Sequence, residues 1–135
     1  MIGSHELTDA KQSTVGQIVD RAARRRGMSA EESSMAAGEL VKFLRVCADS
    51  TASLAPSAIV DDLWHEFILH TKAYSTFCAN ELGTFVHHVP SDRADNSAYM
   101  RARDRIAERF GSVDERFWPA AGANCDSSCG SECSN

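Results

Sequence analysis

The segment VDDLWHEFILH, residues 60–70, decides the fold of this chain. On a helical wheel with about 100° per residue, its apolar side chains, among them Trp64 and Phe67, form one continuous arc. Such an arc is typical of a helix that packs one face into a protein core. We therefore expect a core helix that opens just after Pro56 and runs through Leu69.

Helical signals surround this segment on both sides. Apolar residues recur at helical spacing over residues 13–26, and a capping-box pattern at residues 29–32 begins a second helix. Helices are also predicted over residues 71–82 and 95–110, and a glycine follows each of them. One last helical turn is expected near residues 112–118. The chain is thus predicted to hold about five helices.

Two further segments show no helical pattern. Residues 84–89 are too apolar for an exposed loop, so we expect a buried extended segment that ends at Pro90. Residues 120–135 are small and polar and have little apolar surface to bury, which predicts a flexible tail. The predicted architecture is all-α: a compact bundle of about five helices over residues 13–119, preceded by a flexible lead over residues 1–12.

The bulk composition limits the classes of function. A chain of 135 residues is long enough for one domain with a real core, and its formal net charge of -5 argues against an electrostatically driven nucleic-acid binder. No apolar run approaches the roughly 20 residues that span a bilayer, and no secretion signal is visible. We therefore expect a cytoplasmic protein without nucleic-acid or membrane partners. In such a location, we expect the five cysteines to be free thiols or metal ligands and not disulfide partners.

Histidines concentrate in and after the deciding segment. Asp61 and His65 are four residues apart, so a helix places both at one edge of the apolar arc. They could ligate one metal ion together, or Asp61 could hold the His65 ring in one tautomer while the other ring nitrogen binds or catalyses. His70 follows His65 by five residues and falls on another face, so the His-Glu-Xaa-Xaa-His motif of zinc proteases is absent.

His87 and His88 supply further imidazoles. Adjacent residues of an extended segment point in opposite directions, so only one of them can readily face the preceding helix; we favour His88 and leave His87 open. Cys78 lies between the two groups of histidines in the sequence, on an apolar helix face. It could be a core residue or a further ligand. Two imidazoles and a carboxylate would suit zinc or iron.

A buried polar network is the alternative to a metal site. In that network, the histidines, Asp61 and backbone carbonyl groups would satisfy one another and hold the loop on the helices. A nucleophilic enzyme that pairs Cys78 with His65 or His88 fits less well, because no glycine cluster for an oxyanion hole is visible. The sequence leaves the metal site and the polar network open.

The remaining cysteines fall into two groups. Cys47 lies on the apolar face of the second predicted helix, so we expect a small buried hydrophobe with no functional role. Cys125, Cys129 and Cys133 repeat every four residues in the tail, one thiol short of a closed tetrahedral site. These three could capture a soft metal alone, supply thiolates to a metal in the domain, bridge between molecules, or do nothing specific.

Several uncommon residues occur in an order that resembles a known family. The segment 61–71, Tyr74, Phe77-Cys78, Gly83 and the segment 85–90 are similar to the bacterial branch of the glycine-rich domain-containing protein-like family. The resemblance covers about residues 56–90, and it supports the fold and the importance of this segment. No enzymatic reaction is established for that family, so the resemblance implies no function. Bacterial relatives also end in a small-residue tail, although this chain has serine where glycine often dominates.

The leading hypothesis is a small metal-binding or protein-interaction module. In it, Asp61 orients or co-ligates, His65 ligates, and His87 or His88 completes the site from the loop. The second hypothesis is an enzyme, metal-dependent or with His65 as general base, which requires a cleft beside His65. The third is a structural role for the histidines, with function in the surface or the tail. A module is favoured over a catalyst.

Overall fold

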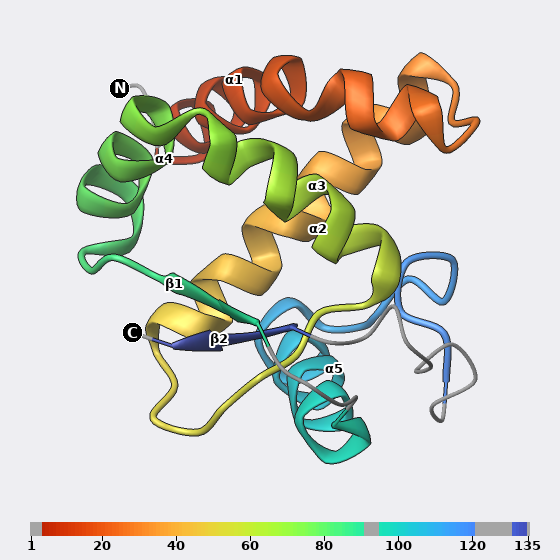
Figure 1. Ribbon diagram of the computed structural model, residues 1–135, viewed down its shortest axis with the longest axis vertical. Helices are drawn as coiled ribbons and strands as arrows, with labels where there is room; N and C mark the ends of the chain where they lie inside the picture. The colour runs from red at the N-terminus through yellow and green to blue at the C-terminus, as the bar shows by residue number, and fades with distance from the viewer. Residues whose placement is uncertain (1–3, 91–94, 121–130, 135) are drawn as a thin grey trace.

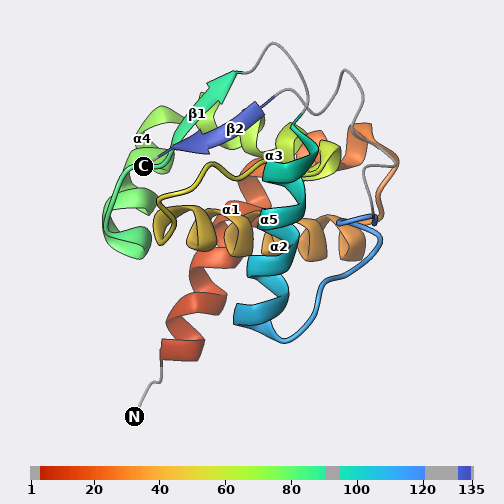
Figure 2. The ribbon, with the colours of Figure 1, turned by 90° about the horizontal axis from the view of Figure 1, so that it is seen from below.

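The computed structural model describes residues 4–90, 95–120 and 131–134 (Figure 1). In chain order its elements are α1 (Ser4–Arg25), α2 (Ala30–Ala48), α3 (Ala58–Leu69), α4 (Thr71–Phe77), η1 (Cys78–Leu82), β1 (His87–Pro90), α5 (Asn96–Phe110) and β2 (Ser131–Ser134). Helix α2 runs through the middle and packs against α1, α3 and α5 (Figure 1, Figure 2). The predicted compact bundle of about five helices is confirmed. Within the described ranges, no helix has the length and apolarity needed to cross a membrane.

Local hydrogen bonds explain where the central helices begin. Before α2, the Glu32 amide donates to Ser29 Oγ at 3.1 Å, and the Ser29 amide donates to Glu32 Oε1 at 3.0 Å. Before α3, Ser57 Oγ accepts from an amide of the first turn at 3.3 Å. Both caps satisfy amides that have no partner within their own helix. Helix α1 starts earlier than predicted, so the expected flexible lead over residues 1–12 is helical from Ser4 onward.

The fourth predicted helix is divided in the structure. Helix α4 ends at Phe77, and the following turn, η1, widens into a π-helix that begins at Cys78. Gly83 ends this turn with a φ of 76°, a conformation that glycine adopts because it has no Cβ. The chain then becomes extended and returns toward α3 as β1 (Figure 1).

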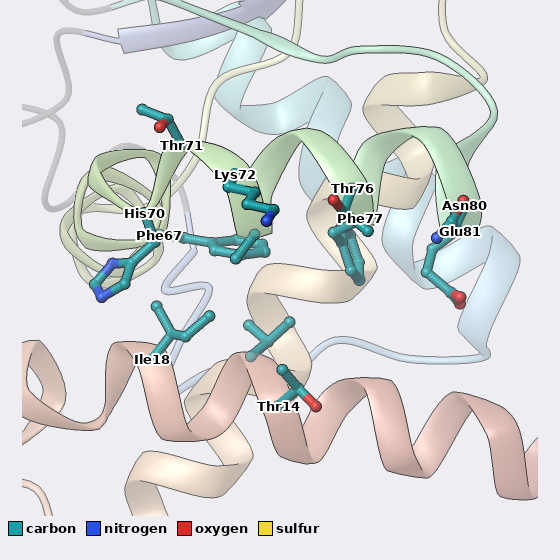
Figure 3. A pocket seen from close by; sticks show the side chains of 12 residues that line it. Thr14, Ile18, Phe67, His70, Thr71, Lys72, Thr76, Phe77, Asn80 and Glu81 are labelled. Atoms are coloured by element: carbon teal, nitrogen blue, oxygen red, sulfur yellow. The ribbon is translucent and has the colours of Figure 1, made fainter.

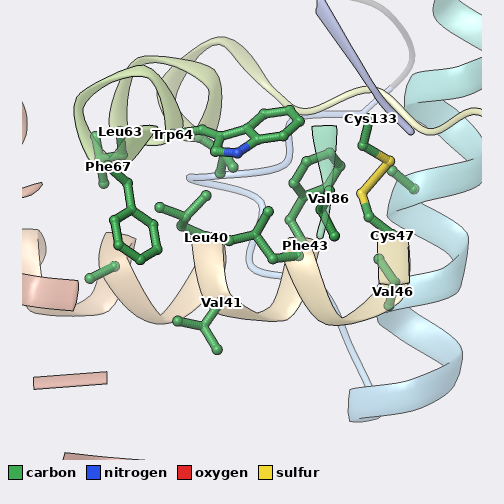
Figure 4. Close-up of a cluster of buried hydrophobic side chains, with 14 of the residues drawn as sticks. Leu40, Val41, Phe43, Val46, Cys47, Leu63, Trp64, Phe67, Val86 and Cys133 are labelled. Atoms are coloured by element: carbon green, nitrogen blue, oxygen red, sulfur yellow. A yellow bond between two sulfur atoms is a disulfide. The ribbon is translucent and has the colours of Figure 1, made fainter. Parts of the chain in front are cut away.

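Aromatic side chains around α2 form the centre of the core. The centroid of the Phe43 ring lies 5.4 Å from that of Trp64 and 5.9 Å from that of Trp118. Figure 4 shows Phe43 and Trp64 in one cluster with Val86, close to a disulfide. Burying a large apolar side chain stabilises a fold by about 1.5–3 kcal/mol. The cluster therefore gives the loop that contains Val86 a rigid surface to pack on.

The extended segment after Gly83 is less buried than predicted. Val86 is fully buried, but Phe85 and Val89 are 43% and 41% exposed. Within β1 only His88 is partly covered. The segment is extended as predicted, yet it lies at the surface and turns alternate side chains inward, so the expectation of a wholly buried segment is wrong.

The C-terminal segment is the main departure from the predicted fold. Residues 131–134 form β2, which pairs antiparallel with β1 and places Cys133 opposite His88. Cys133 is buried and forms a disulfide with Cys47 near the end of α2 (Figure 4). The predicted flexible tail is therefore wrong for these four residues. Pairing with β1 and the cross-link hold a segment whose own composition has little apolar surface.

The disulfide also corrects two predictions about the cysteines. Cys47 is buried as expected, but the prediction that it has no role is wrong, because it forms a cross-link to Cys133. Cys133 is not the free tail thiol that was expected. Cys125 and Cys129 lie outside the described residues, so their predicted roles stay predictions.

Candidate metal centre

Helix α3 carries the first two candidate ligands. Asp61 lies in its first turn, and His65 follows one turn later on the same side, because residues four apart are neighbours on a helix surface. His65 Nε2 lies 3.8 Å from Asp61 Oδ1. The Asp61 side chain is 9% exposed and the His65 side chain 54% exposed. The carboxylate thus forms the inner end of the group and the imidazole its solvent side.

Strand β1 carries the third candidate ligand. His88 Nε2 lies 3.0 Å from Asp61 Oδ1, and the His88 side chain is only 10% exposed. The centroids of the His65 and His88 rings are 4.3 Å apart. One ligand atom from each of the three residues lies within 4.8 Å of the other two. The structure therefore brings together Asp61, His65 and His88 from two separate elements.

Buried polar contacts position the strand that carries His88. The Trp64 indole N–H donates to the Tyr74 hydroxyl at 3.1 Å, and that hydroxyl donates to the carbonyl of Val86, two residues before His88. Burial raises the pKa of Tyr74 far above its ordinary value, so the hydroxyl keeps the proton that it donates. The Trp64 and His88 rings also pack against each other at a steep angle, with centroids 4.3 Å apart.

The positioning role of Trp64 and Tyr74 was not predicted from the sequence. Both residues lie on apolar helix faces, a location that is typical of ordinary core residues. A signal was nevertheless present, since buried tryptophan and tyrosine side chains usually require a partner for their polar atom. The partner, a backbone carbonyl beyond a turn, could not be identified from spacing.

The other predicted ligands lie elsewhere. His87 is exposed, and its ring contacts Phe85 with centroids 4.8 Å apart, as expected when neighbours in a strand alternate. Cys78 is buried at the start of η1, where burial raises the pKa of its thiol. Thiols bind metals as thiolates, so this environment disfavours ligation by Cys78. Neither residue belongs to the converging group.

Two arginines, one at the end of α1 and one directly after it, pair with the other carboxylates of this part of α3. Arg26 forms an ion pair with Asp62, and Arg25 Nη2 lies 3.3 Å from Glu66 Oε1. These pairs draw Asp62 and Glu66 toward α1. Asp61 is the carboxylate of α3 that converges with the histidines.

The geometry of the three ligand atoms suits a small divalent ion. Zinc ligands about 2.1 Å from a tetrahedral ion lie roughly 3.4 Å from one another. The oxygen–nitrogen separations from Asp61, 3.0 Å to His88 and 3.8 Å to His65, lie on either side of that value. Because the His65 side of the group faces solvent, a bound ion would keep at least one open position.

Comparison with known families adds one finding. The model of the UCP032817-like family matches residues 9–115, which is most of the chain. The chain belongs to this family. The matched range contains Asp61, His65 and His88 but ends before β2. No curated protein and no solved structure matches the chain.

The family is uncharacterised, so membership supplies no reaction, ligand or partner. The resemblance to the glycine-rich domain-containing protein-like family is not tested by this match and stays a prediction. The geometry of the site is therefore the feature that indicates a function.

Proposed function

We propose that this protein is a small metal-binding module in which Asp61, His65 and His88 hold one divalent transition-metal ion. The observation that carries the proposal is the convergence of these three side chains from α3 and β1. Two imidazoles and one carboxylate are the ligand set of many open zinc sites and of non-haem iron(II) sites. The proposed ion is accordingly zinc or iron(II).

A bound ion would also fix the position of β1. His88 would then be held to α3 by a metal bond in addition to its 3.0 Å contact with Asp61. Phe85 and Val89 are exposed on the same extended segment. In this proposal, the ion-bound protein presents that segment in one conformation to a protein partner, which links metal binding to the proposed interaction role.

Elemental analysis of tag-free protein, purified without added metal, tests the proposal. We expect one ion per chain in the wild type and none in His65→Ala. His87→Ala is the matched control, because it removes the adjacent exposed histidine of the same strand and should keep the ion. A Cys125→Ser/Cys129→Ser variant should also keep it. Loss of metal only in this cysteine variant, or no metal in any sample, would contradict the assignment.

The polar network is the second candidate, and one observation favours it: the His88–Asp61 contact at 3.0 Å is already complete without an ion. The polar network predicts that His88→Ala lowers the free energy of unfolding by about 1–3 kcal/mol, because the buried Asp61 carboxylate loses one of its hydrogen-bond partners. It also predicts that zinc leaves the melting temperature of the wild type unchanged. Thermal unfolding with zinc and with a chelator separates the two readings, since only the metal module gains stability from zinc.

A further inference from the structure

A second concave site lies apart from Asp61, His65 and His88, and His70 is one of its lining residues. It is a groove between α1 and the helices α3 and α4, with a volume of about 640 Å³. Figure 3 shows Phe67 and Phe77 pointing into it toward Thr14 and Ile18 of α1. Small-molecule sites usually occupy roughly 300–1,000 Å³ and have mainly apolar walls, so the groove has the dimensions and the lining of a ligand site.

The groove has one acidic and one basic side chain at its rim, and they differ in whether they form an ion pair. Glu81 lines it, but its Oε1 lies 3.5 Å from Arg45 Nη2, and both side chains are largely buried. Lys72 also lines the groove, and in the part of the chain that the structure describes it has no ion pair. The negative charge is thus compensated, while the ammonium group of Lys72 remains available beside an apolar wall.

We propose that this groove binds an anionic amphiphile, such as a medium-chain alkyl carboxylate. The alkyl chain would lie between Phe67, Phe77 and Ile18, and the carboxylate would pair with Lys72. Charge complementarity at the rim favours an anion over a neutral or cationic ligand. None of the three residues of the metal centre lines the groove, so the two proposed sites share no ligand-contacting residue.

Isothermal titration with decanoate, below its micelle-forming concentration, tests this proposal. Decanol and decyltrimethylammonium are the neutral and charge-reversed controls. We expect decanoate to bind with one-to-one stoichiometry. Thr76→Trp, which fills the groove from an exposed helix position, should abolish binding of decanoate and decanol alike. Lys72→Met keeps the apolar part of the side chain and removes the charge. It should lower the affinity for decanoate by about tenfold and leave the affinity for decanol unchanged.

Arg21→Met is the matched charge control, because Arg21 is exposed on α1 outside the lining of the groove. It should bind decanoate like the wild type. The proposal is overturned if decanoate does not bind or if Thr76→Trp binds it normally. It is equally overturned if decyltrimethylammonium binds better than decanoate, or if Thr76→Trp instead dissociates a dimer of the wild type in sedimentation experiments.

A different observation concerns the metal centre itself, namely the location of the disulfide. Cys133 lies directly opposite His88 in the β1–β2 register. Its amide donates to the carbonyl of Leu54 at 2.8 Å, just before α3, and its sulfur is bonded to Cys47 of α2. Strand β2 is only four residues long, and an isolated two-stranded ribbon is marginal in water. The disulfide therefore holds β2 in place beside the strand that carries His88.

We infer that reduction of the Cys47–Cys133 disulfide weakens metal binding at the proposed centre, an inference that depends on the proposed function. A dithiol reductant would donate two electrons and two protons: the sulfur–sulfur bond breaks, Cys47 and Cys133 become thiols, and the dithiol becomes a disulfide. Strand β2 would then lose its covalent link, and β1 would lose its paired neighbour.

Zinc competition with a chromophoric chelator tests this inference. All proteins carry Cys125→Ser and Cys129→Ser, so that thiols of the tail do not bind zinc. We expect Cys47→Ala/Cys133→Ser to bind zinc about tenfold more weakly than the oxidised parent, and the reduced parent to match it once the reductant has been removed without air. Circular dichroism should show unchanged helix content. Equal zinc affinity in the oxidised parent and the double variant would overturn the redox inference alone, whereas an oxidised parent that binds no zinc would overturn the metal module itself.

Discussion

The two halves of the candidate metal centre are built in different ways. The helix half, Asp61 and His65, depends on four-residue spacing and on the cap at Ser57. The strand half, His88, depends on distant residues: Trp64 and Tyr74 hold the chain before it, and Cys133 pairs beside it. One half is set by local geometry and the other by tertiary contacts. The four variants below separate these contributions, in order of the effect expected on stability.

Trp64→Ala should have the largest effect, because Trp64 lies on α3 between Asp61 and His65 and its ring also packs on His88. Removing this fully buried side chain should lower the free energy of unfolding by about 3–5 kcal/mol and release the His88 ring that packs on it. Urea unfolding measures the first effect and zinc competition the second. Trp118→Ala is the control: it removes a fully buried side chain of the same size whose ring, among the described residues, contacts Phe43 and Tyr99 and not His88 itself. The Trp118→Ala variant should lose a similar free energy of unfolding yet keep its zinc affinity.

Tyr74→Phe should affect the strand half alone. The change keeps the ring but leaves the Trp64 indole N–H and the Val86 carbonyl without their buried partner. We expect a loss of about 1–3 kcal/mol, with weaker zinc binding and no change in helix content. Urea unfolding and zinc competition on the same samples measure both. Retained zinc affinity would show that Tyr74 does not position His88.

Ser57→Ala should weaken the helix half. It removes the side-chain oxygen that caps the first turn of α3, four residues before Asp61. Loss of such a cap costs about 1 kcal/mol, which thermal unfolding can resolve. Ser34→Ala is the control, since Ser34 is an exposed residue inside α2 and its replacement should change stability by less than about 0.5 kcal/mol. Equal effects of the two variants would argue against the cap.

His65→Ala should have the smallest effect on the apo protein and a decisive effect on the metal-bound one. His65 is half-exposed and 3.8 Å from Asp61, which is beyond hydrogen-bonding distance. With a chelator present to keep both proteins metal-free, His65→Ala should change the free energy of unfolding by less than about 0.5 kcal/mol. At zinc concentrations one hundred times Kd, the free energy of unfolding of the wild type should rise by about 2.7 kcal/mol. This rise should be absent in His65→Ala. A gain that persists in His65→Ala would remove His65 from the ligand set.

The difference between the helix half, which depends on local geometry, and the strand half, which depends on tertiary contacts, explains what the sequence could predict. Periodic apolar residues and caps indicated the helices, and the spacing of Asp61 and His65 indicated the helix half. The choice between His87 and His88 requires the register of β1, and that register involves residues 131–134. Nothing in a run of small polar residues indicates such a pairing.

The disulfide could not be predicted either. Its two cysteines are 86 residues apart, and connectivity does not follow from cysteine spacing. Cys47 matched the pattern of a core residue, and Cys133 matched the pattern of a tail thiol. Each assignment was reasonable locally, and only the fold shows that the two residues meet.

Strand β1 has a consequence for self-association. In the described part of the chain it pairs with β2 alone, so its second edge has unpaired backbone groups of the kind that can recruit another chain. The strand has only four residues, and Pro90 at its end has no N–H to donate. The brevity that makes β1 depend on Cys133 therefore also makes it a poor template for aggregation, even though Phe85 and Val89 are exposed beside it.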